Sequence, residues 1–266
     1  MFNVCKLERA VTVDGICSFF KRSMDEGYSF EGEFHDFYEV VSVIDGEVGI
    51  TSETDVFRLS AGQSIIHSPL EFHSVKSFNK RSRVIIFSFS GNVSKELYGK
   101  IFSTDFYELN AICEDALRIF EYDGIYVTGI KNGLSGEASF LANRIEAYVS
   151  RLILQPFAES SGSSYSSRYT AILSVLNENV DKCLKLENIA ELCNMSVSSL
   201  KKNFRQYSNM GVMSYFSNMK MKKAVTLLRR GMSVKETAFA LGYDDTNYFS
   251  YAFKHIMGRP PSEYKS

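Results

Sequence analysis

Two hydrophobic patterns divide the chain: short alternating runs come first, and apolar residues at helical spacing follow. The alternating or β-branched runs predict strands at residues 38–44, 47–51, 55–59, 64–67 and 83–89. Asp45-Gly46 is typical of a hairpin turn between the first two. Several short strands at this spacing predict a sandwich or barrel between residues 30 and 89.

Past Gly91 the pattern changes to helices. Residues 134–157 carry an apolar stripe that stops near Pro156 and consists of Phe140, Leu141, Ile145, Tyr148, Val149, Leu152 and Ile153. The serine-rich stretch 159–167 is poor in core-forming residues, which is typical of a linker. The chain is therefore predicted to be a two-domain α+β protein, with domains at 1–157 and 169–266 and a linker at 158–168.

Formal charge is divided unevenly between these domains. The whole chain has a net charge of −1, but residues 1–165 contribute −8 and residues 166–266 contribute +7. A basic segment on an acidic body indicates a polyanion-binding module, although a solvated surface can also be basic. Charge alone leaves both interpretations open.

Composition sets broad limits. Hydrophobic residues make up 45% of the chain and charged residues 23%, which is typical of a folded, soluble protein. We expect a cytoplasmic protein with no membrane partner, because we find no signal peptide and no run near the roughly 18 apolar residues of a membrane span. The cysteines have no CxxC spacing, which predicts reduced core thiols at Cys5, Cys17, Cys113, Cys183 and Cys193.

A first helix-turn-helix pattern begins near Leu186. Residues 186–193 form a short amphipathic helix, and Asn194 tolerates the left-handed conformation of a tight turn. Ser196 can then cap a second helix at 197–206. This order predicts a compact pair of helices.

The same pattern returns about 49 residues later. Ser233 caps a helix at 234–241, Gly242 makes the turn, and Asp244 or Asp245 caps a helix that runs to about Ile256. The inward-facing residues match in pairs at one offset, Leu200 with Phe249 and Phe204 with Phe253. An internal repeat of this kind is much more specific than a single copy.

One helix at residues 212–230 separates the two motifs and spans roughly 28 Å at about 1.5 Å per residue. Two recognition helices held that far apart can enter successive major grooves, which lie about 34–36 Å apart. An ordinary helical core is the alternative, but the repeat, the spacing and the basic charge together favour DNA binding.

Residues from about Leu186 to Tyr264 resemble the AraC/XylS family of transcription regulators. The resemblance rests on LGYDD at 241–245, YFSYAFK at 248–254 and the ending GRPPSEYK at 258–265. It implies a regulator that binds double-stranded DNA, with base-facing residues at Ser198, Lys201 and Lys202 of one recognition helix and at Asn247, Ser250 and Tyr251 of the other. The helical pattern also places three further candidates on these outer faces, Arg205, Thr246 and Lys254.

The segment departs from the family in a few places. Asn194 and Asn209 stand where the family usually has glycine, and asparagine is the mildest replacement at a left-handed position. Lys220 stands where the helix between the motifs usually carries arginine, so a bidentate contact becomes a point charge. Ser250 and Tyr251 are weakly basic, so the second motif is expected to read less sequence than the first.

The first domain resembles a cupin β-barrel, which many regulators of this family carry. The resemblance rests on Gly27-x5-Glu33-x-His35-x3-Glu39-x6-Gly46 and on Gly62-x10-His73. In metal-binding cupins these positions carry three histidines and a glutamate; here Glu33 replaces the first histidine, and Ser68 and Leu70 replace the proline and glycine of the second motif.

The resemblance implies that Glu33, His35, Glu39 and His73 face one barrel interior and bind a small-molecule effector. Two carboxylates and two imidazoles suit a hydroxyl-bearing molecule such as a sugar. A metal ion or a purely structural role are the alternatives, and we assign neither a metal nor a cofactor. His67 alternates out of phase with this set and is expected to be an ordinary strand residue.

The sequence thus predicts a one-component regulator that is not an enzyme. We expect a homodimer, with RNA polymerase as a further partner. The stripe at 140–153 is the candidate interface, and packing of this helix inside its own domain is the alternative. A cupin metalloenzyme with a helical appendage is the alternative, but it leaves the repeat and the charge division unexplained. A barrel that acts only as a scaffold is a second alternative.

Overall fold

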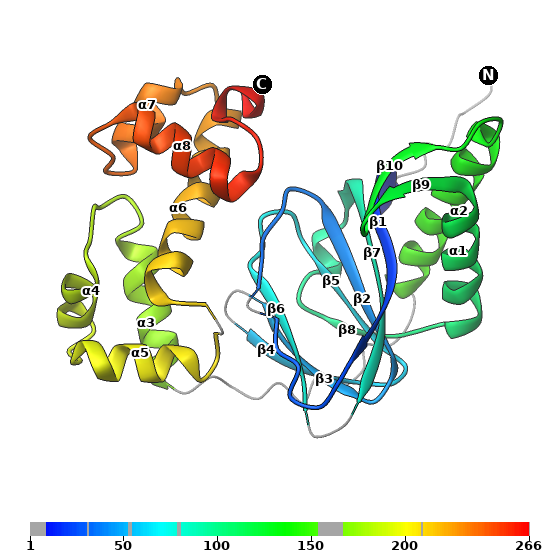
Figure 1. The fold of residues 1–266 in the computed structure, drawn as a ribbon, viewed down its shortest axis with the longest axis horizontal. Coiled ribbons are helices and arrows are strands. Elements are labelled where there is room, and N and C mark those ends of the chain that lie inside the picture. Colours follow the sequence, from blue (N-terminus) through cyan, green and yellow to red (C-terminus); the bar gives the residue numbers. More distant parts are fainter. Residues whose placement is uncertain are drawn as a thin grey trace, which may run out of the picture. The chain divides into compact units, whose positions relative to one another are not determined.

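The computed structural model describes residues 9–30, 32–52, 55–78, 81–153, 167–208 and 210–265. Its contacts divide the chain into two units (Figure 1). One is sheet-rich and is built from residues 1–30 and 36–163; the other is mainly helical and is built from residues 164–266 together with the short segment 31–35. This agrees with the predicted α+β class. The predicted linker at 158–168 lies outside the described residues as far as 166, and Ser167 and Arg168 belong to a helix.

Two antiparallel sheets form the first unit. The larger has the strand order β8-β5-β2-β7-β1-β10-β9, and the smaller has the order β4-β3-β6. The strands are β1 (Val11–Met24), β2 (Tyr38–Asp45), β3 (Glu47–Ser52), β4 (Asp55–Ser60), β5 (Gln63–His67), β6 (His73–Ser77), β7 (Ser82–Val93), β8 (Ile101–Ser103), β9 (Phe120–Asp123) and β10 (Tyr126–Ile130).

Alternation along each strand gives the larger sheet two buried faces. On β2, Val41 and Val43 pack toward the smaller sheet, in a core shared with Val48 and Ile50 of β3. The opposite face, including Val40, packs against helices α1 (Phe106–Ile119) and α2 (Ser135–Ile153). A short 3-10 helix, η1 (Lys95–Leu97), follows β7. The first unit therefore has three layers: small sheet, large sheet and helices (Figure 1).

The five predicted strands are present, but the pattern missed five others, β1, β6, β8, β9 and β10. Strand β1 pairs along its length with β7 and has register shifts between Val13 and Gly15 and between Ile16 and Ser18. Each shift interrupts the period of two that identifies a strand in the sequence. Strands β8, β9 and β10 have only three to five residues and lie in the region that was predicted to be helical.

Helix α2 corrects the prediction of a dimerisation stripe. Ile145, Val149 and Leu152 are fully buried within their own unit, against the larger sheet and α1. Phe140 points outward and is 69% exposed. The side chain of Ile153 lies outside the described set. The stripe is therefore internal core, because one face of an amphipathic helix was needed to cover the sheet.

In the second unit, from Ser167 onward, every helix or strand that the structure describes is a helix. They are α3 (Ser167–Glu178), α4 (Leu186–Leu192), α5 (Val197–Arg205), α6 (Val212–Arg229), α7 (Val234–Ala240), α8 (Thr246–Met257) and the 3-10 helix η2 (Pro261–Tyr264). Its buried side chains come from all of these elements, which gives the unit a core of its own. The helix bounds agree with the predicted ones to within one or two residues.

Two sequence expectations concern thiols and membranes. None of the cysteines at 17, 113, 183 and 193 forms a disulfide, and Cys5 lies outside the described residues. Among the described residues, no helix has the length and apolar character needed to cross a membrane.

Candidate nucleic-acid interface and sensor site

The first helix-turn-helix motif is formed by α4 and α5. Between them, Asn194 has a left-handed φ of 53°, as the tight turn requires. The Ser196 hydroxyl accepts a hydrogen bond from the Ser199 backbone N–H at 3.2 Å and so caps α5. Leu200 and Phe204 are fully buried on the inner face. These contacts confirm the predicted motif.

The outer face of α5 carries the predicted DNA-binding residues, and all four are exposed: Ser198, Lys201, Lys202 and Arg205. Lys201 and Arg205, four residues apart on the helix, line a pocket of about 250 Å³ together with the first turn of α6. Ser198 and Lys202, also four residues apart, occupy a neighbouring strip of the same helix. The helix thus presents two polar strips, and only one of them faces the pocket.

The second motif is formed by α7 and α8. A capping box begins α7, where the hydroxyl of Ser233 accepts from the Glu236 backbone N–H and the Glu236 carboxylate accepts from the Ser233 backbone N–H. Asp245 caps α8 by accepting from the backbone N–H groups of Asn247 and Tyr248. Phe249 and Phe253 are fully buried, so the repeat predicted from the 49-residue offset is present in the structure.

The predicted DNA-binding residues on α8 are less uniformly exposed than those on α5. Asn247, Tyr251 and Lys254 are exposed, whereas Thr246 and Ser250 are half-buried. The Ser250 hydroxyl donates to the Thr246 carbonyl at 2.8 Å, so its proton is already used within the helix. Tyr251 is 71% exposed and stacks on the His255 ring.

Sequence reasoning omitted one aromatic residue at this end of α8. Tyr248 is 63% exposed and lies next to Asn247, at the start of the helix. Its position in the repeat gave no indication of exposure, because aromatic residues at helical spacing are usually core. It joins the candidate surface as a side chain able to make an apolar contact with a base.

Lys220 links both motifs to α6. Its ammonium donates to the carbonyl of Lys182, ahead of α4, at 2.7 Å and to the carbonyl of Leu241, at the end of α7, at 2.6 Å. It also stands over the rings of Phe216 and Tyr243. Burial lowers the pKa of Lys220 to about 8, which leaves the amine mostly protonated at neutral pH. The point charge expected here is therefore an internal clamp.

Gly242 allows the backbone segments held by this clamp to approach closely. Its φ is +73°, and a Cβ at this position would lie 2.8 Å from the Asp181 carbonyl oxygen and 2.9 Å from the Cys183 nitrogen. Only glycine fits both the conformation and the space. The turn of the second motif therefore packs directly on the segment that leads into the first.

In the first unit, Glu39 and His73 face each other across the two sheets. Alternation places Glu39 with Val41, toward the smaller sheet, and the register of β6 places His73 beside Ser52 on the opposite wall. A Glu39 carboxylate oxygen lies 3.2 Å from His73 Nε2. Both side chains are buried, as the barrel prediction required.

His67 belongs to this cluster, which corrects the expectation that it lies out of phase. It is the Cα partner of Glu39 in the β2–β5 ladder, and directly paired residues point to the same face. Its ring is fully buried and stacks on that of His73, with centroids 4.3 Å apart. Register between strands, which the sequence does not display, decides its direction.

Glu71 anchors both imidazoles and was also missed by sequence reasoning. Its carboxylate lies 2.8 Å from His67 Nδ1 and accepts from the backbone N–H and hydroxyl of Ser68 and from the hydroxyl of Ser52. Its backbone carbonyl accepts from His73 Nδ1 at 3.0 Å. Burial alone would raise the pKa of Glu71, but the hydrogen bonds, led by that from His67, lower it to about 2.

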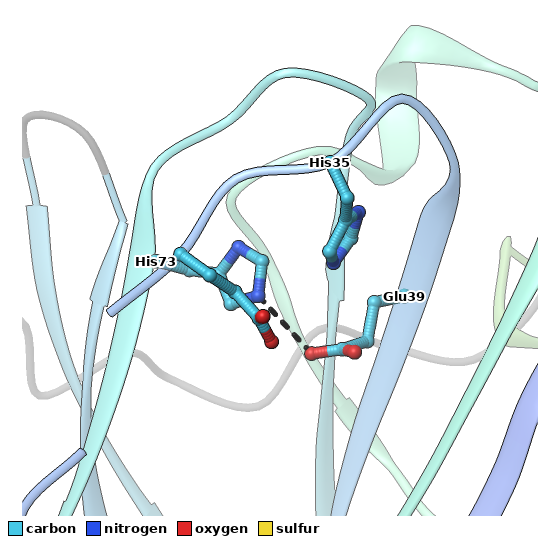
Figure 2. A group of neighbouring side chains, drawn as sticks. His35, Glu39 and His73 are labelled. Atoms are coloured by element: carbon cyan, nitrogen blue, oxygen red, sulfur yellow. Dashed lines mark ion pairs between the residues drawn. The ribbon is translucent and has the colours of Figure 1, made fainter. Parts of the chain in front are cut away.

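The four residues predicted from cupin spacing come together. One ligand atom from each of Glu33, His35, Glu39 and His73 lies within 4.8 Å of the other three. Figure 2 shows His35, Glu39 and His73 pointing toward one another, with the contact between Glu39 and His73 marked. The chain reaches Glu33 after running beside β6, where the Phe30 N–H donates to the Val75 carbonyl.

Comparison with known proteins matches the helical unit to regulators. Residues 189–266 match a family model described as a helix-turn-helix domain. The HTH-type transcriptional activator RhaR of Mannheimia succiniciproducens is 32% identical over 109 residues, which cover 41% of this chain and 40% of that protein. The Msm operon regulatory protein of Streptococcus mutans is 25% identical over 252 residues, which cover 91% of this chain and 88% of that protein.

One solved structure matches a share of this chain similar to that matched by RhaR. The C-terminal domain of AraT, a response regulator from Geobacillus stearothermophilus, is 30% identical and covers 39% of this chain and 87% of that chain, with a TM-score of 0.37. The chain thus spans less than half the length of the first relative and most of the length of the second.

Proposed function

We infer that this chain, which carries the helix-turn-helix domain of the AraC/XylS regulators, is a bacterial transcription regulator that binds specific double-stranded DNA. The observation that carries this is the pair of motifs on one linking helix, each with a capped second helix whose outer face is polar and exposed. The net charge of +7 on residues 166–266 supplies the non-specific attraction to phosphate.

In this proposal, the two polar strips of α5 contact different parts of the DNA. Lys201 and Arg205 face the pocket beside α6, where a second wall can hold a phosphate group against both cations. Ser198 and Lys202 then read base edges. On α8, Asn247 supplies the amide suited to bidentate contact with adenine, and Tyr251 supplies an apolar surface. Thr246, Ser250 and Lys254 contribute to the same surface.

We assign the first unit to sensing. The support for this assignment is the buried set of carboxylates and imidazoles between the sheets. The side chains around this set form an apolar core, in which buried polar groups are unusual unless they have a role. The four predicted ligand atoms lie too close together for a sugar ring to enter among them. A hydroxyl-bearing effector would therefore contact the set from one side.

The oligomeric state, the protein partner and the location follow from the proposed role as a regulator. A homodimer would place two DNA-binding units on one operator, and RNA polymerase would be the partner through which transcription changes. The operator DNA and RNA polymerase of a bacterium are both found in the cytoplasm. Regulation is the whole activity in this proposal, with no enzymatic reaction.

Two adjacent lysines provide a sharp test of DNA binding. Operator DNA is selected from a random pool with the full chain, and affinity for operator and random DNA is measured by fluorescence anisotropy at several salt concentrations. Lys201→Ala should weaken binding to both DNAs and reduce the salt slope by about one, as loss of a phosphate contact does. Lys202→Ala should cost about 1–3 kcal/mol on the operator and much less on random DNA.

Lys95→Ala in the first unit is the charge-matched control and should leave both affinities unchanged, since Lys95 is exposed and lies on η1. If both lysine variants on α5 behave like this control, or if the folded chain shows no salt-dependent DNA binding, the proposed function is wrong. If Lys201→Ala selectively weakens operator binding, the assignment of the two strips is wrong while DNA binding stands.

A further inference from the structure

The recognition helix of the second motif, α8, differs in chemistry from that of the first. At the 49-residue offset of the repeat, Asn247 takes the place of Ser198. Tyr251 takes the place of Lys202 at the same offset. Ser198 and Lys202 form the strip of α5 that is assigned to base edges. An amide and an aromatic ring therefore stand on α8 where the first motif presents a hydroxyl and a cation.

Two tyrosine rings are exposed on α8. Tyr248 is 63% exposed and Tyr251 is 71% exposed, and a spacing of three residues places them on neighbouring positions of one helix surface. Each ring is supported by another ring. Tyr251 stacks on His255 with an interplanar angle of 6°, and Tyr248 lies against Tyr243 with a centroid distance of 6.1 Å. Because these contacts already restrict the rings, little further ordering is needed when they meet a ligand.

The same helix offers few hydrogen-bond donors for guanine. Guanine presents two acceptors in the major groove, O6 and N7, and is read by the paired donors of arginine or by lysine. Helix α8 contains no arginine, and its only lysine, Lys254, lies in the last turn. The Ser250 hydroxyl donates its proton to the Thr246 carbonyl within the helix. The first two turns of α8 are therefore poorly suited to G·C pairs.

Thymine matches the exposed rings. Its C5 methyl is an apolar group that projects into the major groove, where apolar side chains contact it. Contact between a tyrosine ring and this methyl removes both surfaces from water, which stabilises the complex without a hydrogen bond. Asn247 is exposed in the same turn, and a side-chain amide pairs with N6 and N7 of adenine. Amide and rings thus suit the two bases of A·T pairs.

We propose that α8 selects A·T base pairs, with Tyr248 and Tyr251 in contact with thymine methyl groups and Asn247 bonded to adenine. This selection rests on the proposed function and adds to it the bases that the second motif prefers. Lys202 of the first motif suits guanine. The operator therefore has one half-site that depends on a G·C pair and another that depends on A·T pairs.

Uracil tests the proposal because it differs from thymine only in lacking the C5 methyl. Operator DNA is selected from a random pool with the full chain, and each thymine is then replaced by uracil in turn. Fluorescence anisotropy should show a loss of about fourfold in affinity at each contacted thymine, the value for one buried methyl group. The loss should occur only in the half-site whose base preference relaxes in Asn247→Ala.

Tyrosine variants link each methyl to a side chain through a double-mutant cycle. In Tyr251→Ala or Tyr248→Ala, the thymine that the deleted ring contacts should no longer lose affinity when it becomes uracil. Phenylalanine at either position should retain the loss, because the ring remains. All these side chains are exposed, so circular dichroism should show unchanged helix content.

Two controls lie outside α8. Lys202→Ala should weaken operator binding but keep the uracil effect, which locates that effect in the second motif. Tyr107→Ala removes a tyrosine of α1 that is 87% exposed, and it should change neither operator affinity nor the uracil effect.

Equal affinity for the thymine and uracil operators would overturn the proposal. So would a uracil effect that persists in both alanine variants, or a preference for G·C pairs at the positions that Asn247→Ala affects. Phenylalanine variants as weak as the alanine variants, with no uracil effect, would show that the hydroxyls contact phosphate instead. A folded chain that binds no DNA would overturn the proposed function as well, whereas a chain that binds its operator without a uracil effect would overturn only the A·T selection.

Discussion

At the scale of single residues, buried polar side chains decide how the second unit holds together. Lys220 donates to two backbone carbonyls, that of Lys182 ahead of α4 and that of Leu241 at the end of α7. Lys220→Met keeps the aliphatic stem but leaves both carbonyls without this donor. We expect a loss of about 1–3 kcal/mol in the free energy of unfolding, measured by urea denaturation followed by circular dichroism.

Lys223→Met is the matched control, because Lys223 lies on the same helix and is exposed. Its substitution should change stability by no more than about 0.5 kcal/mol. Equal urea midpoints for the two variants would show that the Lys220 clamp adds nothing to stability.

At the scale of elements, helix α2 shows how packing inside a unit competes with association between chains. The apolar stripe that suggested a dimer interface covers the larger sheet, with Ile145 fully buried. Ile145→Ala should therefore destabilise the first unit by about 2–5 kcal/mol without changing the oligomeric state of the folded chain. Thermal unfolding and light scattering after size-exclusion chromatography measure the two effects.

Phe140→Ala on the same helix is the control, since this side chain is mostly exposed. It should change the melting temperature little, because few contacts are lost. If Ile145→Ala instead produces a stable monomer from a dimer, the stripe is an interface between two chains.

At the scale of the whole molecule, charge and core both divide at the same place. The helical unit has its own buried core, and residues 164–266 carry a net charge of +7 against −8 for residues 1–163. We expect the fragment 164–266 to fold alone and to bind DNA with an affinity that falls as salt rises. The fragment 1–163 should fold and show no DNA binding in the same anisotropy assay.

Failure of the fragment 164–266 to fold would show that its core depends on the first unit. A folded fragment that binds DNA as weakly as the acidic fragment would contradict the assignment of DNA binding to the helical unit. Circular dichroism separates loss of binding from loss of structure, because it reports the helices independently of DNA.

The sequence by itself determined the features that depend on local spacing. The helix bounds from α4 to α8, the caps at Ser196 and Ser233, and the left-handed turn at Asn194 follow from residue types within one or two turns. The meeting of Glu33, His35, Glu39 and His73 also followed from spacing, through the resemblance to the cupin motifs.

Only the tertiary structure decided what each apolar or polar face meets. The bulges of β1 hid the longest strand, and the register of β2 on β5 turned His67 toward Glu39. Helix α2 was recognisable as amphipathic, but whether its stripe covers a sheet or another chain depends on what lies beside it. Lys220 gained its role from two carbonyl partners that lie 38 and 21 residues away in the chain, which local spacing does not bring together. Interactions between residues that are close in the chain can be predicted from the sequence pattern. Interactions between residues that are close only in space cannot, because folding brings those residues together.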